Sequence, residues 1–113
     1  MEIKGEEYRI HYDVETTTVT CQGSFRRRRA EYAPIKQLLN EIAEATPSRI
    51  TLDARELQFL NSSGINMFSK FVIRVRKLKR SQLVLLGNRE ILWQPKSFGN
   101  LKRLMRGLTL EWT

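Results

Sequence analysis

The chain has 113 residues, a mass of 13.3 kDa and a formal net charge of +8. This length suits a single domain over residues 1–113, because one hydrophobic core usually forms from about 100–150 residues. No apolar stretch reaches the roughly 18 residues of a membrane-spanning helix. The N-terminal residues are polar rather than signal-like, and the lone Cys21 excludes an internal disulfide. We therefore expect a cytoplasmic domain that does not bind membranes.

The first half of the chain predicts a hairpin, a helix and a buried strand. Residues 8–14 alternate apolar and polar side chains, and residues 17–23 alternate with β-branched side chains, as strands do. Apolar residues recur at three- and four-residue spacing from about 31 to 45, which indicates a helix that ends before Pro47. Residues 49–54 predict a short buried strand.

The second half predicts two helices that alternate with two strands. An amphipathic helix is expected over about 63–79, and the apolar run 82–87 is typical of an interior strand covered on both faces. A third helix is expected over about 97–106 and a last strand over 108–112. The order β-β-α-β-α-β-α-β predicts an α/β domain with a mixed, mostly parallel sheet and an antiparallel N-terminal hairpin.

Positive charge is concentrated in the second half of the chain. Residues 1–56 carry a net charge of −1, whereas residues 57–113 carry +9. A basic nucleic-acid-binding module that uses Arg26–Arg29 and the second helix is therefore an alternative function. Against it, Arg76 and Arg80 fall on a different side of that helix from Arg74 and Lys77, and no aromatic residues are interleaved with the charge.

The sequence contains no recognisable set of catalytic or metal-binding residues. Its only histidine, His11, has no second ligand-type residue beside it, and no glycine-rich phosphate-binding motif occurs. Asp53 and Glu56 are interpreted as a strand-end and loop pair rather than an acid–base couple. We expect a protein that is not an enzyme and that needs no cofactor or metal.

A turn of small polar residues, Asn61-Ser62-Ser63-Gly64, separates the apolar residues Leu57, Phe59 and Leu60 from the second helix. Such residues cap helices, because the first amides of a helix lack partners. A serine placed there lies at the positive end of the helix dipole, which favours a phosphate group.

The stretches Ile50–Ala54 and Leu57–Ile65 resemble the signature region of STAS domains, as found in bacterial anti-sigma factor antagonists. In that family a hydrophobic strand leads into Asp-Ser-Ser/Thr-Gly and a helix. The resemblance implies a STAS-like fold, with helices mainly on one face of the sheet. It also implies a partner-switching regulator of transcription that binds an anti-sigma factor. That partner is also a serine kinase, and a phosphatase reverses its action. We expect a monomer or a weak dimer.

Carried over by position, the resemblance makes Ser62 the phospho-acceptor, Ser63 the following Ser/Thr, and Gly64 the glycine that lets the partner approach. Asn61 stands where the family has aspartate, and it removes a negative charge beside the acceptor. Two alternatives follow: Ser62 is phosphorylated and releases its partner, because a phosphate adds about −1.5 to −2 charges, or the protein binds its partner constitutively.

Four consecutive arginines precede the first helix: Arg26, Arg27, Arg28 and Arg29. In a STAS-like topology their loop should lie at the same end of the domain as the serine turn. There it would complete a binding rim that attracts an acidic partner, or it is simply a solvated loop. Trp93 and Trp112 are expected to pack at the edge of the core, with Trp93 also placed to join an interface.

Overall fold

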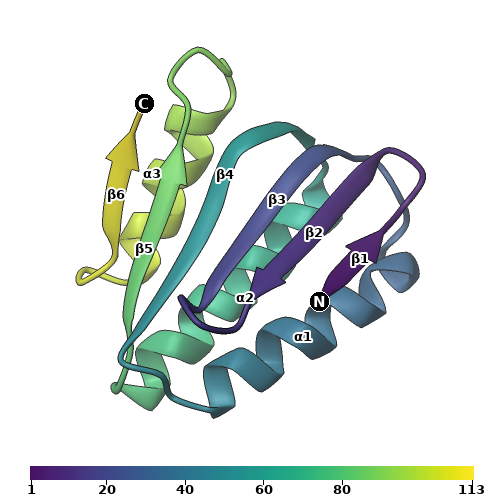
Figure 1. Ribbon diagram of the computed structural model, residues 1–113. Coiled ribbons are helices and arrows are strands. Elements are labelled where there is room, and N and C mark those ends of the chain that lie inside the picture. Colours follow the sequence, from purple (N-terminus) through teal and green to yellow (C-terminus); the bar gives the residue numbers. More distant parts are fainter.

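The computed structural model describes residues 1–113 and consists of a six-stranded sheet with three helices on one face (Figure 1). The helices are α1 (Ala33–Glu44), which follows a 3-10 turn at Arg29–Tyr32, α2 (Ser62–Leu78) and α3 (Gln94–Leu104). None of them has the length and apolar character needed to cross a bilayer. The strands, in chain order, are β1 (Glu2–Lys4), β2 (Tyr8–Asp13), β3 (Thr18–Phe25), β4 (Arg49–Leu60), β5 (Gln82–Gly87) and β6 (Thr109–Trp112).

The order of the strands across the sheet is the same as their order in the chain. The strands β1, β2 and β3 pair antiparallel, and β3, β4, β5 and β6 pair parallel through one helix each. Parallel crossovers are right-handed, so successive crossovers in the same direction place every helix on the same face. The expected mixed, mostly parallel sheet with helices on one face is confirmed.

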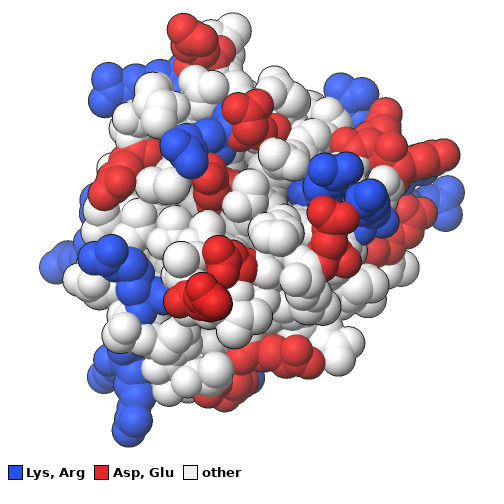
Figure 2. Space-filling model, in the orientation of Figure 1, with Lys and Arg blue, Asp and Glu red and all other residues white.

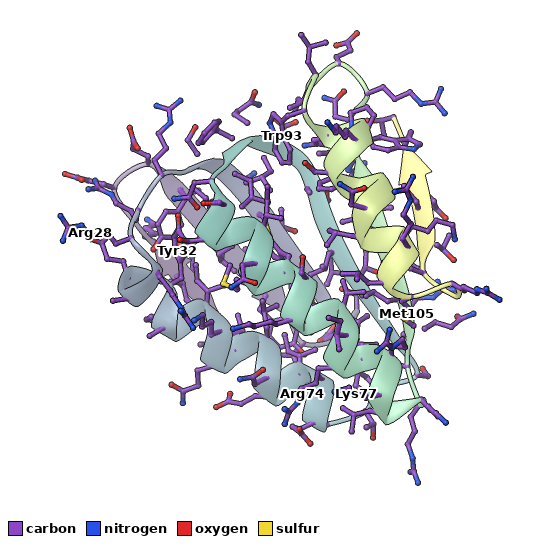
Figure 3. The ribbon with its side chains drawn as sticks, turned by 180° about the vertical axis from the view of Figure 1, so that it is seen from behind. Arg28, Tyr32, Arg74, Lys77, Trp93 and Met105 are labelled. Carbon is purple, nitrogen blue, oxygen red and sulfur yellow. The ribbon has the colours of Figure 1, made fainter.

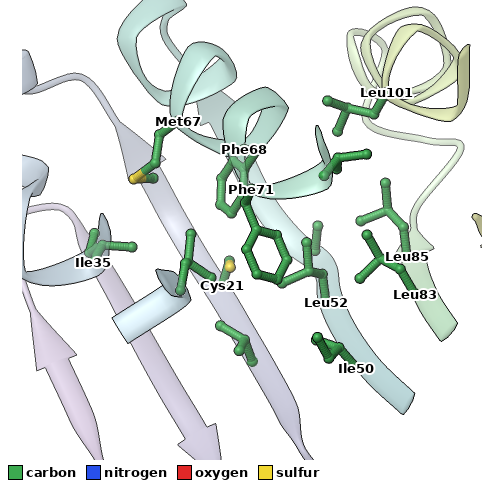
Figure 4. Close-up of a cluster of buried hydrophobic side chains, with 14 of the residues drawn as sticks. Cys21, Ile35, Ile50, Leu52, Met67, Phe68, Phe71, Leu83, Leu85 and Leu101 are labelled. Atoms are coloured by element: carbon green, nitrogen blue, oxygen red, sulfur yellow. The ribbon is translucent and has the colours of Figure 1, made fainter. Parts of the chain in front are cut away.

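The core lies between the sheet and the helices (Figure 4). Inward-facing residues such as Leu52 and Leu85 alternate with more exposed neighbours along their strands, and they pack against Phe71 of α2 and Leu101 of α3. Cys21 of β3 is part of this core, and burial raises the pKa of its thiol to about 12. A thiol with so high a pKa stays protonated and serves as an apolar packing group.

The expected coverage of β5 on both faces was wrong. Leu83 and Leu85 are buried beneath the helices, whereas Val84 and Leu86 lie half-exposed on the open face of the sheet. A continuous apolar run indicates a strand but does not specify how many layers cover it. The number of layers follows from the direction of the crossovers.

The strand β4 is longer than expected, because it continues beyond Ala54 to Leu60. Two register shifts against β3 interrupt its alternation, so that Leu57 and Leu60 face the core while Phe59 remains 40% exposed. Such bulges add residues to one strand and change the direction of the side chains that follow. This extension carries the chain to the start of α2.

The pairing of β4 with β5 ends at Asp53. Beyond that residue, β4 is held by a buried side chain. The Nε2 of Gln94, a fully buried residue, donates to the carbonyls of Ala54 at 2.8 Å and Leu57 at 2.9 Å. Its Oε1 accepts from the amide of Asn88 at 2.7 Å. These bonds pair carbonyls in the part of β4 that lies beyond its pairing with β5.

Two further boundaries differ from expectation. The strand β1, which the sequence did not indicate, has only three residues, too few for a recognisable period. The helix α3 begins at Gln94 instead of Ser97 and ends at Leu104 instead of Arg106. Its second residue is Pro95. Proline suits a first helical turn because it has no backbone N–H, and the N–H groups of that turn have no partner within the helix.

Candidate protein-binding site

The serine turn lies at the end of the sheet where β4 leads into α2 (Figure 1). Asn61 is the N-cap of α2: its Oδ1 accepts a hydrogen bond from the Gly64 amide at 2.9 Å. Its carbonyl accepts from the Ile65 amide, also at 2.9 Å, which begins the helical pattern. The helix therefore begins at Ser62, one residue earlier than expected, and its cap is Asn61.

Asn61 also joins α2 to the arginine loop. Its Nδ2 donates to the carbonyl of Arg27 at 2.7 Å. The hydroxyl of Tyr32 accepts from the Arg27 amide at 3.0 Å and donates to Asn61 Oδ1 at 3.3 Å. We call these three residues the Asn61 clasp. Burial raises the pKa of Tyr32 above its ordinary value, so the hydroxyl keeps the proton that it donates.

The clasp gives a structural reason for an asparagine at a position where the resemblance led us to expect aspartate. A primary amide offers an acceptor and a donor at once, and both are used here. A carboxylate would still cap Gly64, but its other oxygen would meet the carbonyl of Arg27 without a proton between them. In this chain Asn61 therefore both caps the helix and holds the loop.

The residues that follow Asn61 differ in exposure. Ser62 is exposed as the first residue of α2, and Ser63 is half-buried. Gly64 is buried, and a Cβ built on it would lie 2.4 Å from Cδ1 of Leu60. The absence of a side chain at Gly64 therefore makes room for Leu60. The hydroxyl of Ser62 is the group that this turn displays to solvent.

Two of the four arginines are occupied within the protein. The guanidinium of Arg26 lies over the ring of Phe59, 4.9 Å from its centroid, a cation–π contact. Arg27 pairs with Glu6 and, at 3.8 Å, with Glu31. These contacts and the clasp order the loop despite its accumulated charge.

Arg28 and Arg29 are exposed and take part in none of the ion pairs within the protein. Because the clasp fixes their loop against the start of α2, their charges lie at the same end of the domain as Ser62. Figure 3 shows Arg28 extending outward from this end, beyond Tyr32. The structure thus brings the serine turn and the arginine run together, and it leaves two cations free.

Exposed apolar side chains lie at this end as well, which the sequence reasoning missed. Leu92, in the loop between β5 and α3, is 91% exposed. The same loop is attached to β4 because the Nε1 of Trp93 donates to the carbonyl of Gln58 at 2.7 Å, next to the exposed Phe59. The only sequence feature that pointed to an interface in this loop was Trp93 itself. We call five of the exposed residues at this end the α2 rim: Arg28, Arg29, Phe59, Ser62 and Leu92.

Trp93 and Trp112 both pack on Phe98 of α3, with ring centroids 5.6 Å and 5.9 Å away. The expected role of both tryptophans at the edge of the core is confirmed. Trp93 therefore acts as an anchor for the loop that displays Leu92.

The cations of α2 do not form a single stripe. Arg74 contacts Glu44 of α1, whereas Nη1 of Arg76 donates to the carbonyl of Leu104, at the end of α3, at 2.9 Å. The open face of the sheet carries charges of both signs (Figure 2). These observations agree with the sequence argument that the helix lacks the continuous basic stripe of a nucleic-acid-binding surface.

Asp53 and Glu56 both lie within β4, not at a strand end and in a loop as expected. The carboxylate of Asp53 accepts two hydrogen bonds from the guanidinium of Arg55, at 2.9 and 2.8 Å. Partial burial raises the pKa of Asp53, but these bonds outweigh it and hold the pKa below its ordinary value. Asp53 is the acceptor of a structural ion pair.

The strand order, the single helical layer and the capped serine turn between β4 and α2 define a STAS-like domain, as expected from the sequence. By sequence alone, the chain matches no protein-family model and no curated protein. The similarity is carried by structure, and it establishes the fold.

Three solved structures show this similarity. A structure of the diguanylate cyclase SiaD in complex with its activator SiaC, from Pseudomonas aeruginosa, matches with a TM-score of 0.76 at 14% identity, over 100% of this chain and 99% of the matched chain. An anti-sigma factor antagonist from Mycobacterium paratuberculosis matches with a TM-score of 0.70 at 13% identity, over 96% and 90%. SiaC of Pseudomonas aeruginosa matches with a TM-score of 0.64 at 14% identity, over 100% and 94%.

Proposed function

We propose that this protein is a non-enzymatic regulator that binds a partner protein through the α2 rim, and that phosphorylation of Ser62 controls the binding. The observation that carries the proposal is the exposed hydroxyl of Ser62 at the start of a capped helix, beside two unpaired arginines. The similarity to an anti-sigma factor antagonist and to SiaC, an activator that forms a complex with an enzyme, supports a protein as the partner.

The rim has the composition of a protein interface. Phe59 and Leu92 offer apolar contact area, and Arg28 and Arg29 at its border attract carboxylates during encounter. We therefore expect a partner whose contact surface is acidic around an apolar centre. An anti-sigma factor that is also a serine kinase fits this role, and a phosphatase would restore the unphosphorylated state.

A phosphate on Ser62 would lie at the positive end of the α2 dipole, where negative charge is stabilised. Asn61 adds no like charge next to it, so the modified side chain is tolerated by the free protein. In the complex, the same phosphate would place about two negative charges in an interface matched to acidic groups, and the complex would separate. The phosphate therefore acts on binding and leaves the fold intact.

The test compares Ser62→Asp and Ser62→Ala as baits in lysate of the native cell, with Ser48→Asp as the matched control. Ser48 is exposed in the loop between α1 and β4, away from the rim. We expect one ATP-binding partner to be retained by wild type, Ser62→Ala and Ser48→Asp, and lost by Ser62→Asp. Equal retention by all four baits would refute control through Ser62.

Intact-mass analysis of protein purified from its native cell tests the modification itself. We expect a species heavier by the mass of one phosphate, about 80 Da, which disappears in Ser62→Ala. Retention of partner by wild type without this species under any growth condition would favour the constitutive alternative.

A further inference from the structure

A basic groove lies at the opposite end of α2 from Ser62, between the C-terminal ends of α2 and α3. Its volume is about 560 Å³. Arg76 and Lys79 border it on the α2 side, and Arg103 and Arg106 on the α3 side, with Leu104 and Met105 in its apolar floor. Figure 3 shows Met105 at the end of α3, facing the last turn of α2 that carries Lys77.

The charge of this groove is unopposed. No carboxylate lines it, and its four cations take part in none of the ion pairs within the protein. Arg76 donates one N–H to the carbonyl of Leu104. This hydrogen bond holds the guanidinium in place and leaves its other N–H donors available. Arg74, two residues earlier in α2, differs in that Glu44 neutralises it.

We propose that the basic groove binds a small ligand that carries two or more linked phosphate groups. Guanidinium and ammonium groups are the side chains that recognise phosphate oxygens, and four residues that carry them line this groove, at the C-terminal ends of α2 and α3 and just beyond them. The volume falls within the range of small-molecule sites, about 300–1,000 Å³. The floor at Leu104 and Met105 provides apolar contact for an organic group attached to the phosphates.

The arrangement of the four cations favours a compact ligand over a nucleic-acid strand. A strand needs cations along an extended path and aromatic side chains on which bases stack. In this protein the four cations surround one hollow, none of its lining residues is aromatic, and Arg74 is directed toward α1.

The groove is separate from the α2 rim. The 17 residues of α2 span about 25 Å, so the two sites lie at opposite ends of one helix. Ligand binding in the groove therefore does not depend on the function proposed for Ser62.

The test is a titration of ¹⁵N-labelled protein with pyrophosphate and, separately, with ADP, followed by amide chemical shifts. We expect saturable shifts confined to residues 75–81 and 103–107. Tighter binding of ADP would assign the ligand to nucleotide-like organic phosphates, and equal affinity would assign it to the linked phosphates themselves.

The variant Arg103→Gln/Arg106→Gln should weaken binding roughly tenfold or more, since two of four charge-assisted contacts are lost. The control Arg28→Gln/Arg29→Gln removes the same charge at the α2 rim and should bind as wild type does. An absence of saturable binding at millimolar ligand, or equal weakening in both variants, would overturn the proposal. So would tighter binding of a 20-nucleotide single strand with shifts along the whole of α2, which would indicate a nucleic-acid surface.

Discussion

The two ends of α2 use positive charge in opposite ways. At the α2 rim, half of the arginine run is occupied by Phe59 and by carboxylates, and a hydrogen-bonded clasp orders the backbone. At the basic groove, four cations face one hollow without a carboxylate. The longest run of basic residues in the sequence thus supplies only two free cations, whereas residues at the C-terminal ends of α2 and α3 and just beyond them supply the larger unopposed charge. What surrounds a charge determines its availability, and proximity in sequence does not.

The largest expected effect comes from removing the Asn61 clasp. Asn61→Ala leaves the Gly64 amide and the Arg27 carbonyl without these side-chain partners, and it removes the acceptor of the Tyr32 hydroxyl proton. We expect the free energy of unfolding in urea to fall by about 2–3 kcal/mol. The control Asn100→Ala, on the exposed side of α3, should change it by less than about 0.5 kcal/mol. If Asn61→Ala behaved like this control, the rim would not be ordered by its clasp.

Tyr32→Phe should have a smaller effect, about 1–2 kcal/mol, because the Arg27 amide alone loses its acceptor. The raised pKa of Tyr32 also predicts a pH dependence. Its contribution to stability is complete below the ordinary tyrosine pKa of about 10 and is lost as pH rises through the folded-state value.

Wild type should therefore lose more stability between about pH 9 and pH 11 than Tyr32→Phe does. Tyr8 and Cys21, whose pKa values are also raised by burial, are present in both proteins. Parallel urea-stability profiles of the two proteins would contradict the role of the Tyr32 hydroxyl, and Tyr12→Phe controls for loss of a phenol.

The dipole of α2 predicts opposite responses at its two ends. Ser62→Asp adds a negative charge at the first residue and should raise the thermal stability by about 0.3–1 kcal/mol at low salt. Lys77→Glu places a negative charge in the last turn and should lower the thermal stability by a similar amount. Both shifts should shrink in 0.5 M salt. Shifts of the same sign would show that local contacts outweigh the dipole.

The smallest expected changes in stability distinguish an arginine that forms ion pairs from one that has no carboxylate partner. Arg27→Gln removes the partner of Glu6 and Glu31 and should lower stability by about 0.5 kcal/mol. Arg106→Gln relieves repulsion in the basic groove and should raise stability by a few tenths of a kcal/mol, an increase that disappears in high salt. Differential scanning calorimetry at two salt concentrations distinguishes the two. A loss of stability in Arg106→Gln would mean that the groove charge is compensated.

Much of the fold could be predicted because apolar periodicity is a local property. The stripes of α1 and α2 and the alternation in β2 and β3 follow from neighbouring residues, and they led to the correct order of the strands and α-helices that follow β1. The end of β4 was misplaced because two bulges break the alternation after Ala54. Nothing near these bulges in sequence marks them, since the amide that satisfies their carbonyls belongs to Gln94.

The candidate site was predicted in part. The serine turn was recognisable as a cap and by its resemblance to a known motif, and the arginine run was visible as charge. The hydroxyl of Tyr32 was overlooked, because its ring lies on the apolar stripe and its partner is 29 residues away. Leu92 was overlooked because a single leucine in a loop carries no pattern.

By itself, the sequence determined the order of the helices and of the strands after β1, that small polar residues cap the second helix, and that the second half of the chain is strongly basic. These features depend on the spacing of side chains along the backbone. The tertiary structure decided which cations are neutralised, why position 61 needs an amide, and which apolar side chains stay in water. Those outcomes depend on hydrogen bonds and contacts between residues far apart in the chain, which form only when the crossovers bring the strands and helices together.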